Sequence, residues 1–290
     1  MAALLLTLFV WRCLKRPDPL LDVRLFRSKP FTAGTVAAFT ASLAMAGIML
    51  LVAQWLQGVA GFTPILAGLA LLPMAVGSLA TAPFAPTLAI RFGARAILSG
   101  GLAVAGIGLV GLFALRGLDT YWQLIAPLVL VGAGTGALAI ASAIIMGSTP
   151  QEKAGNAAAI EESMYDLGNV FGIALLGSIA AVLYRAYLDI QNFTGDGITG
   201  QLAVEANESV VGALIVAESA GLPELAAAAT AAFVTALGRA ALVGGVIMLL
   251  AAIAVYLLVP RGFDITAHNH PDDPPADPPA QAQTARGLTH

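Results

Sequence analysis

Three carboxylates lie inside one long apolar stretch of the chain. Glu161, Glu162 and Asp166 fall within Ala154 to Tyr184, where most other side chains are apolar. An ionised group near the centre of a bilayer costs about 2.5 to 3.5 kcal/mol on insertion scales. On a helix, Glu162, Asp166 and Asn169 have the spacing i, i+4 and i+7, which places them on one face. We expect this polar strip to face a cavity or the interior of a helix bundle.

The chemistry available to such a strip is the binding of a proton or a cation. Partial desolvation and like-charge neighbours allow a carboxyl group to exchange a proton near neutral pH. Once ionised, the same group attracts a cationic ligand, and alternating between the two is the minimal chemistry of an antiporter. The competing interpretation is a structural ion pair. The spans offer few partners for it: Arg239 near the outer end of its helix, and Arg91 and Arg95 in a loop.

Four further residues are candidates for lining a substrate cavity. Tyr165 forms a neighbouring stripe with Glu161, and Asn169 ends the polar strip. Met74 and Met164 could line a pocket for apolar ligands, because flexible thioether side chains adapt to irregular surfaces. Packing within the bundle is the simpler explanation for both methionines.

Composition limits the class of protein. Hydrophobic residues make up 58% of the 290 residues and charged residues only 11%, whereas soluble domains are about 25% charged. Mean hydropathy is +0.85. A soluble fold needs a polar shell that this chain cannot supply, so the expected surroundings are a lipid bilayer.

The same composition excludes several functions. The formal net charge of -3 provides no basic surface for nucleic acid. The one cysteine, Cys13, rules out an internal disulfide framework and a cysteine cage for a metal. All three histidines, His268, His270 and His290, lie near the end of the chain, so none is available for catalysis inside a membrane. We therefore expect neither a cofactor nor a metal site.

Six apolar stretches are long enough to cross a bilayer, which takes about 20 residues. They predict an all-α, multi-pass transmembrane helix bundle over residues 31–261, with Pro73, Pro83 and Pro86 bending the second span. The stretches are Phe31 to Gln57, Ile65 to Ile90, Ala96 to Leu115, Tyr121 to Met146, Ala154 to Tyr184, and Ala231 to Val259.

Basic residues orient the bundle, because Lys and Arg favour cytoplasmic loops. Six of them between Arg12 and Lys29 place that segment inside. Alternation then places Gln57 to Pro64 outside, and Arg91 and Lys153 inside. The expected location is the inner cell membrane, with a cytoplasmic C-terminal tail.

The connections between spans carry weaker signals. Residues 185–230 form an outside loop that could contain a short helix near Leu202 to Ser219. Thr149 and Glu152 have the spacing of a capping box at the start of the fifth span. Residues 262–290 are rich in Pro and Asp and are expected to be a disordered tail.

Small residues recur inside the spans. The run from Gly132 to Gly136 has the glycines of a phosphate-binding loop, but it sits in an apolar span with no preceding strand. Gly168 and Gly172 are spaced as in transmembrane helix dimers. We expect both sets to serve close helix packing.

Residues 1–30 combine a partial helix with a basic linker. Ala2 to Trp11 is apolar but reaches only about half of the hydrocarbon core. The charges Arg12, Lys15 and Arg16 follow this stretch, whereas in a signal peptide they precede it. We expect the stretch to be the end of a longer helix that began upstream.

Three stretches of the chain resemble one family. Pro19 to Arg27 (PLLDVRLFR) and Gly61 to Pro73 (GFTPILAGLALLP) are similar to segments around the ninth helix of the 14-helix drug:proton antiporter branch of the major facilitator superfamily. Gly155 to Asn169 (GNAAAIEESMYDLGN) is similar to the thirteenth helix of its quaternary-ammonium-compound efflux group. The resemblance covers about Leu4 to Arg261.

This resemblance implies a fold and a function. The six spans would be helices nine to fourteen, the second six-helix half of a major facilitator fold, preceded by a truncated helix. Glu161, Glu162 and Asp166 would recognise a cationic amphiphilic substrate or couple its efflux to protons. A facilitator binds substrate between two halves, so this C-terminal portion would need an N-terminal half. Ser78 stands where some quaternary ammonium pumps carry an acidic residue, which argues against divalent cations.

Other functions stay open at this point. The chain could be a non-functional membrane remnant, or a facilitator that exports a lipid or a metabolite. An intramembrane aspartyl protease is disfavoured because the one Gly-Asp motif, at Gly195-Asp196, lies in the outside loop. We therefore expect a transporter and not an enzyme.

Overall fold

The chain is helical throughout its described part. The structure is a computed structural model that describes residues 22–114, 120–196, 198 and 200–263. Within these ranges no strand is found, and six helical stretches are long and apolar enough to cross a membrane. The predicted all-α multi-pass bundle is thereby confirmed. The expected partial helix at residues 2–11 and the tail from residue 264 onward lie outside the described residues.

The six spans follow the expected order along the chain. The first is α2 (Lys29–Gln54), continued by the π-helical turn η2 (Trp55–Val59); the second comprises α3 (Pro64–Ala70), α4 (Leu72–Thr81) and α5 (Ala85–Phe92); the third is α6 (Ala94–Ala114); the fourth comprises α7 (Trp122–Thr135) and α8 (Leu138–Gly147); the fifth is α9 (Ala154–Leu188); and the sixth is α12 (Pro223–Leu258). Short helices connect them: η1 (Val23–Arg27), η3 (Gln151–Lys153), η4 (Ile190–Asp196), α10 (Gln201–Glu208) and α11 (Val210–Ala220).

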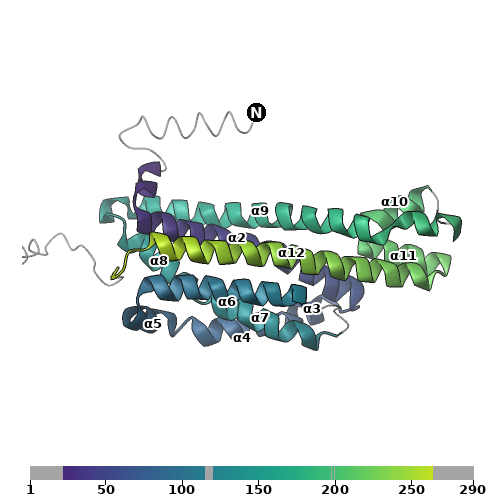
Figure 1. Ribbon diagram of the computed structural model, residues 1–290, viewed down its shortest axis with the longest axis horizontal. Coiled ribbons are helices and arrows are strands. Elements are labelled where there is room, and N and C mark those ends of the chain that lie inside the picture. Colours follow the sequence, from purple (N-terminus) through teal and green to yellow (C-terminus); the bar gives the residue numbers. More distant parts are fainter. Residues whose placement is uncertain (1–21, 115–119, 197, 199, 264–290) are drawn as a thin grey trace, which may run out of the picture.

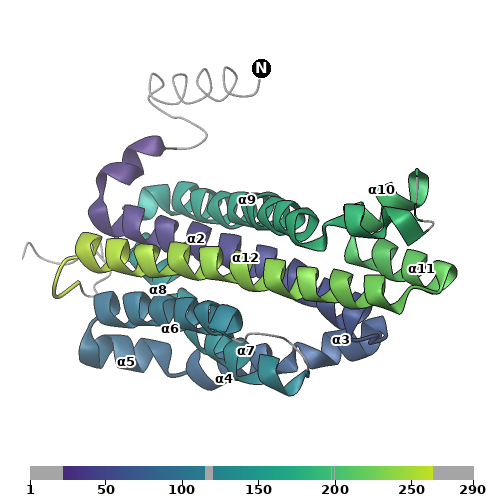
Figure 2. The same cartoon turned by 45° about the vertical axis from the view of Figure 1, so that its right-hand side comes forward.

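The spans pack side by side with their axes roughly along one direction (Figure 1). Helix α2 contacts α9 and α12, and α12 also contacts α6. Beyond α6 lie α7 and then α4, as the rotated view in Figure 2 also shows. Helices α10 and α11 cover the end of the bundle at which α9 ends and α12 begins.

Glycines lie where the longest helices cross. A Cβ atom on Gly47 of α2 would lie 2.6 Å from the carbonyl oxygen of Gly172 on α9. A Cβ atom on Gly245 of α12 would lie 2.8 Å from the carbonyl oxygen of Gly106 on α6. Neither position has room for a larger residue. Lipid tails are as apolar as Leu, so helices in a bilayer associate through such close contacts rather than through hydrophobic exclusion.

The glycine run in the fourth span makes contacts in two directions. The backbone at Gly132 faces the backbone of Met74 on α4, and Gly134 faces Gly101 on α6. Glycines in this run thus bring α7 against two neighbours. This confirms the prediction of close helix packing for the run.

Prolines interrupt the second span at the positions where the sequence predicted bends. Pro73 lies in the first turn of α4, and Pro86 lies in the first turn of α5. A proline removes a backbone donor and clashes with the preceding turn, so each position starts a new helix rather than continuing the old one. Pro83 falls in the turn between α4 and α5.

The structure corrects three expectations about the connections. Thr149 does not cap the fifth span, because its hydroxyl donates to the carbonyl oxygen of Ile145 at 2.7 Å. The segment at residues 185–230 holds two helices, α10 and α11, separated at Ser209, whose Oγ accepts a hydrogen bond from the Gly212 amide at 3.0 Å. The last span starts at Pro223 instead of Ala231, because proline and the alanines after it favour a helix start that an apolarity criterion overlooks.

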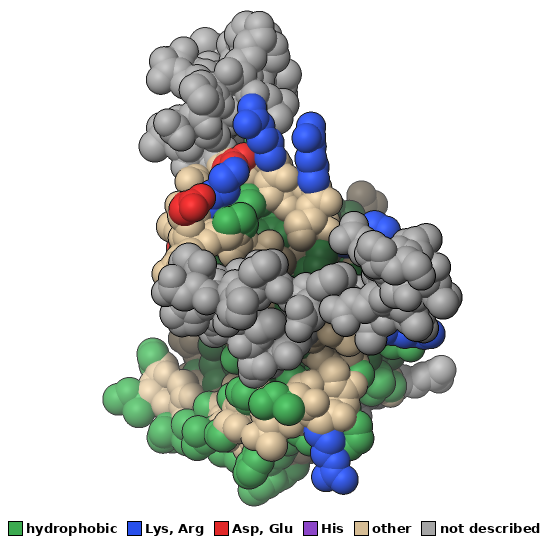
Figure 3. Space-filling view, turned by 90° about the vertical axis from the view of Figure 1, so that its left-hand side faces the viewer, with side chains coloured by type: hydrophobic (Ala, Val, Ile, Leu, Met, Phe, Trp, Pro, Cys, Tyr) green, Lys and Arg blue, Asp and Glu red, His purple; other side chains and the backbone are tan. Residues whose placement is uncertain are grey.

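Basic side chains gather at one end of the bundle. Lys and Arg side chains project from the end viewed in Figure 3, where η1, the α5–α6 junction and the start of α9 meet. One acidic side chain there is buried: Asp22 accepts a hydrogen bond from the Arg24 amide at 3.1 Å and pairs with Lys153 Nζ at 2.6 Å. This pair ties the segment before α2 to the start of α9.

The crossing of α2 and α9 can be tested at one glycine. In Gly172→Ala, the added Cβ atom would lie 2.8 Å from the Cα atom of Leu43 and closer still to its carbonyl oxygen. We expect the overpacking to cost about 1 to 3 kcal/mol and to lower the thermal midpoint in detergent. Gly155→Ala on the same helix is the control, because nothing lies within 4 Å of its Cβ position. Equal midpoints for the two variants would contradict the crossing.

The Asp22–Lys153 pair predicts a pH dependence of stability. The hydrogen bond from Lys153 lowers the pKa of Asp22 below its ordinary value. The folded state therefore gains stability from the ionised Asp22 above its ordinary pKa of about 3.9, and loses that gain as the pH falls through the lowered value. The Lys153 side chain is 43% exposed, so solvent screens part of the effect. In thermal unfolding, Asp22→Asn should be less stable than the parent at neutral pH and approach it in acid; a gap that widens in acid would refute the pair.

Candidate functional site

The acidic residues of α9 divide between two sides of the helix. Glu161 is buried at 8% exposure, whereas Glu162, Asp166 and Asn169 are all exposed on the described bundle. Neighbouring residues on a helix are about 100° apart, because a turn holds about 3.6 residues. One of two adjacent glutamates can therefore face the packed neighbours while the other faces outward. The predicted strip of Glu162, Asp166 and Asn169 does share one side of α9.

Glu161 has a single hydroxyl partner. Ser142 on α8 donates a hydrogen bond from its Oγ to Glu161 Oε2 at 3.1 Å. Among the residues that the structure describes, no Lys or Arg forms an ion pair with Glu161, and the one pair found is Asp22–Lys153. A buried carboxylate with one neutral donor is poorly compensated in apolar surroundings. Ser142 gave no signal in the sequence, because a lone serine in an apolar span is unremarkable.

Ser42 on α2 joins the middle of α9. Its Oγ lies 2.8 Å from the carbonyl oxygen of Tyr165 and 2.7 Å from Asn169 Oδ1. A hydroxyl has one proton, so it can donate to only one of these oxygens at a time. If the Asn169 amide is turned over, its nitrogen donates to Ser42 instead. Both Tyr165 and Asn169 are thereby held against α2 at the Gly168 crossing, where the Cβ position lies 2.5 Å from the carbonyl oxygen of Phe39.

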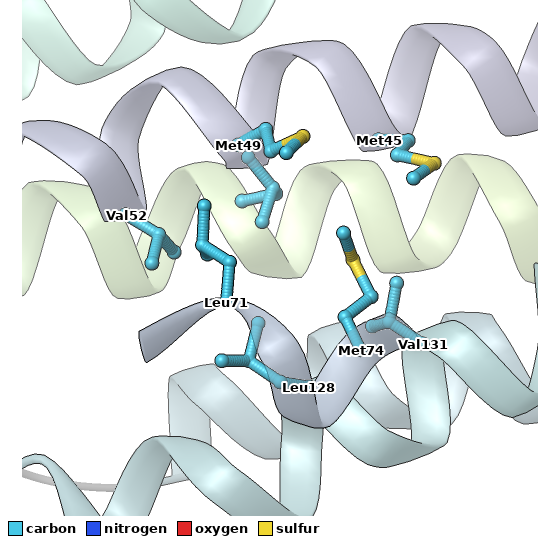
Figure 4. A pocket seen from close by; sticks show the side chains of 8 residues that line it. Met45, Met49, Val52, Leu71, Met74, Leu128 and Val131 are labelled. Carbon is cyan, nitrogen blue, oxygen red and sulfur yellow. The ribbon is translucent and has the colours of Figure 1, made fainter. Parts of the chain in front are cut away.

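Met74 borders a small apolar recess between three helices. Figure 4 shows side chains from α2, α4 and α7 converging there, with the sulfur atoms of Met45, Met49 and Met74 around it. The recess is small, with about 10 Å³ of space that a water-sized group can occupy. Its lining is entirely apolar: Met45, Ile48, Met49, Val52, Leu71, Met74, Leu128 and Val131.

Met164 lies elsewhere. It packs against a separate cluster near the basic end, formed by Leu25, Phe31, Ile145, Ala157 and Ile160. The structure thus brings the two methionines to different places, one at the recess and one beside η1. Helix α2 connects the recess with the acidic helix, because it carries Met45 and Met49 as well as Ser42.

In the described ranges, no group of His, Cys, Asp or Glu side chains has the arrangement of a metal site. Glu161, Glu162 and Asp166 follow each other along one helix instead of converging on a point.

Comparisons with known proteins show which family the chain belongs to. Residues 34–188 match the family described as Major Facilitator Superfamily. The chain is 32% identical over 252 residues to the multidrug efflux pump LfrA of Mycolicibacterium smegmatis, a match that covers 86% of this chain and 49% of that protein.

Two further relatives are also named for drug resistance. The methyl viologen resistance protein SmvA of Salmonella typhimurium is 34% identical over 218 residues, covering 75% of this chain and 43% of that protein. The multidrug resistance protein Stp of Mycobacterium tuberculosis is 31% identical over 194 residues, covering 65% and 35%. The chain spans about half the length, or less, of these curated relatives.

The partner of Glu161 can be tested by a double-mutant cycle. Ser142→Ala leaves the buried carboxyl group without its hydroxyl donor, which typically costs about 1 to 3 kcal/mol. We expect a lower thermal midpoint in detergent, and recovery of much of the loss when Glu161→Leu is added, because both polar partners are then gone. Ser163→Ala is the control, since that hydroxyl donates to the Ala159 carbonyl of its own helix. Strictly additive effects of Ser142→Ala and Glu161→Leu would exclude the coupling.

Proposed function

Because the chain belongs to the major facilitator superfamily, a family of membrane transporters, we propose that it exports lipophilic or quaternary ammonium cations in exchange for protons. We further propose that it does so as the C-terminal half of a complete transporter, in the inner cell membrane. The observation that carries this proposal is the set of three carboxylates on α9, one buried and two exposed, inside a membrane-spanning helix.

The carboxylates explain how protons and cations could compete. Ionisable residues inside transmembrane segments face a bundle interior or a water-filled cavity, and they mark ion pathways and proton relays. Glu162 and Asp166 are exposed on the described bundle, which supports a role in meeting a cation from a cavity. Glu161 is close to them in the chain but buried in apolar surroundings, where a neutral carboxyl group that holds a proton is less costly than an ionised one.

The relatives support the substrate class. Two of them are named as multidrug proteins, and a third is named for resistance to methyl viologen, a doubly charged quaternary nitrogen compound. The methionine side chains around the recess at Met74 add an adaptable apolar surface for the apolar part of such a molecule. Ser78 in place of an acidic residue makes singly charged cations the better expectation for this chain.

The length of the match supports the second half of the proposal. Facilitators bind substrate near the membrane midplane at the interface between structural repeats. The part of the relatives left uncovered is at least as long as the part that this chain matches. The exposed side of α9 with Glu162 and Asp166 would then border the cavity that the other half closes.

Efflux from a pump-deficient bacterial host tests the proposal. The chain is expressed alone and joined to the part of SmvA that the match leaves uncovered, and everted vesicles are given a pH gradient and tetraphenylphosphonium or methyl viologen. We expect gradient-driven uptake of tetraphenylphosphonium by the joined protein only, and its loss in Asp166→Asn and in Glu162→Gln. Glu218→Gln, at an exposed position on α11, should leave uptake unchanged.

The possible outcomes distinguish the proposed cation export from the other functions. Unchanged uptake in both α9 variants would remove the role given to the strip. Uptake of neither cation despite confirmed membrane insertion would favour a facilitator for a metabolite or lipid, or a non-functional remnant. Uptake of methyl viologen alone would reverse the expectation drawn from Ser78.

A further inference from the structure

Arg239 is an unusual residue for its position. It is the single charged residue of α12 after Glu224, and its side chain is exposed. Within the described part of the chain, no carboxylate lies at ion-pair distance from it. An arginine on a membrane-spanning helix needs a partner, because leaving it uncompensated in hydrocarbon is costly.

One neighbour orients the guanidinium group. The Cζ atom of Arg239 lies 4.8 Å from the centre of the Tyr187 ring, on the last turn of α9. Tyr187 is itself 40% exposed. The ring holds one face of the planar cation and leaves its N–H groups directed away from the ring. These donors are available to an anion approaching from outside the protein.

The exposed side of α12 below Arg239 is apolar and continuous. Val246, Leu250, Ile253 and Leu257 are exposed by 45%, 61%, 58% and 72%. Their spacing from Arg239 keeps all five residues on one side of the helix. The rise from Arg239 to Leu257 is about 27 Å at about 1.5 Å per residue, close to the roughly 30 Å thickness of a hydrocarbon core.

A second arginine–tyrosine pair closes the opposite end of this stripe. Arg95 Cζ lies 3.7 Å from the centre of the Tyr256 ring, and Tyr256 neighbours Leu257. Tyrosine and arginine at both limits of an apolar surface are the pattern that headgroup regions impose on a membrane protein. A contact with another protein would not require two arginine–tyrosine pairs separated by about the thickness of a hydrocarbon core. The polar strip that we expect to face a cavity lies on α9, whereas this apolar stripe lies on α12.

We propose that Arg239 and Tyr187 form a binding site for the phosphate of a phospholipid, in the leaflet at the end of the bundle opposite Asp22. The guanidinium group donates hydrogen bonds to the phosphate oxygens, and the tyrosine ring sits at the level of the glycerol backbone. The acyl chains lie along the stripe from Val246 towards Leu257. This site does not depend on the transport function proposed above.

Lipid-dependent stability of the purified full chain tests this site. In neutral detergent, phosphatidylglycerol should raise the thermal midpoint, whereas diacylglycerol with the same chains and inorganic phosphate should not. In Arg239→Gln the apparent affinity for phosphatidylglycerol should fall about five-fold, the contribution of one basic side chain at a lipid surface. Arg185→Gln is the matched control, because Arg185 is exposed on the last turns of α9 and stacks on no ring of the described residues.

The alternatives give different results in the same assay. An equal response of Arg239→Gln and the parent would overturn the site, as would full stabilisation by diacylglycerol. Stabilisation by inorganic phosphate alone would show a free-anion site instead of a lipid site. If Arg239→Gln is not folded, Tyr187→Leu provides the second variant, with Tyr187→Phe retaining the ring as its control; undiminished lipid binding in Tyr187→Leu would equally reject the proposal.

Discussion

At the main crossings of this bundle, a glycine lets the backbone of one helix touch the backbone of the next. Gly47 and Gly172 set the separation of α2 and α9, and Gly106 and Gly245 that of α6 and α12. Because lipid offers no hydrophobic drive for association, this contact, repeated along the chain, determines how the spans are rotated about their axes. The rotation of α9 in turn decides which carboxylate faces its neighbours.

The consequence is that the acidic residues of a single helix lie in different surroundings. Packing at Gly168 and Gly172 turns Glu161 towards α8 and leaves Glu162 and Asp166 outside the described core. Ser42 strengthens the arrangement, because it links α2 to Tyr165 and Asn169 at the same level as the glycine contact. The polar strip and the packing surface both belong to α9. Any rotation of this helix about its axis would therefore change the surroundings of both.

Much of this architecture follows from the sequence, for identifiable reasons. Span length and hydropathy depend on single segments, so the six crossings were predictable. The proline breaks in the second span were predictable for the same reason, because each depends on a single residue. Interactions between segments were not: Ser142 and Ser42 acquire their roles only when α8 and α2 meet α9. The Thr149 hydroxyl could either cap the fifth span or donate to the carbonyl oxygen of Ile145, and the sequence could not show which hydrogen bond would form.

The spans also differ in stiffness. Helices α6, α9 and α12 run without a break, and α12 contacts both of the others. Helix α2 ends in a π-helical turn, α3 to α5 are interrupted at prolines, and α7 gives way to α8 near Gly136. Sharp bends in helices occur at prolines, glycines and π turns. The bundle thus combines three unbroken helices with three interrupted spans. Any bending of the bundle is therefore expected at these interruptions, in the spans that line the methionine recess.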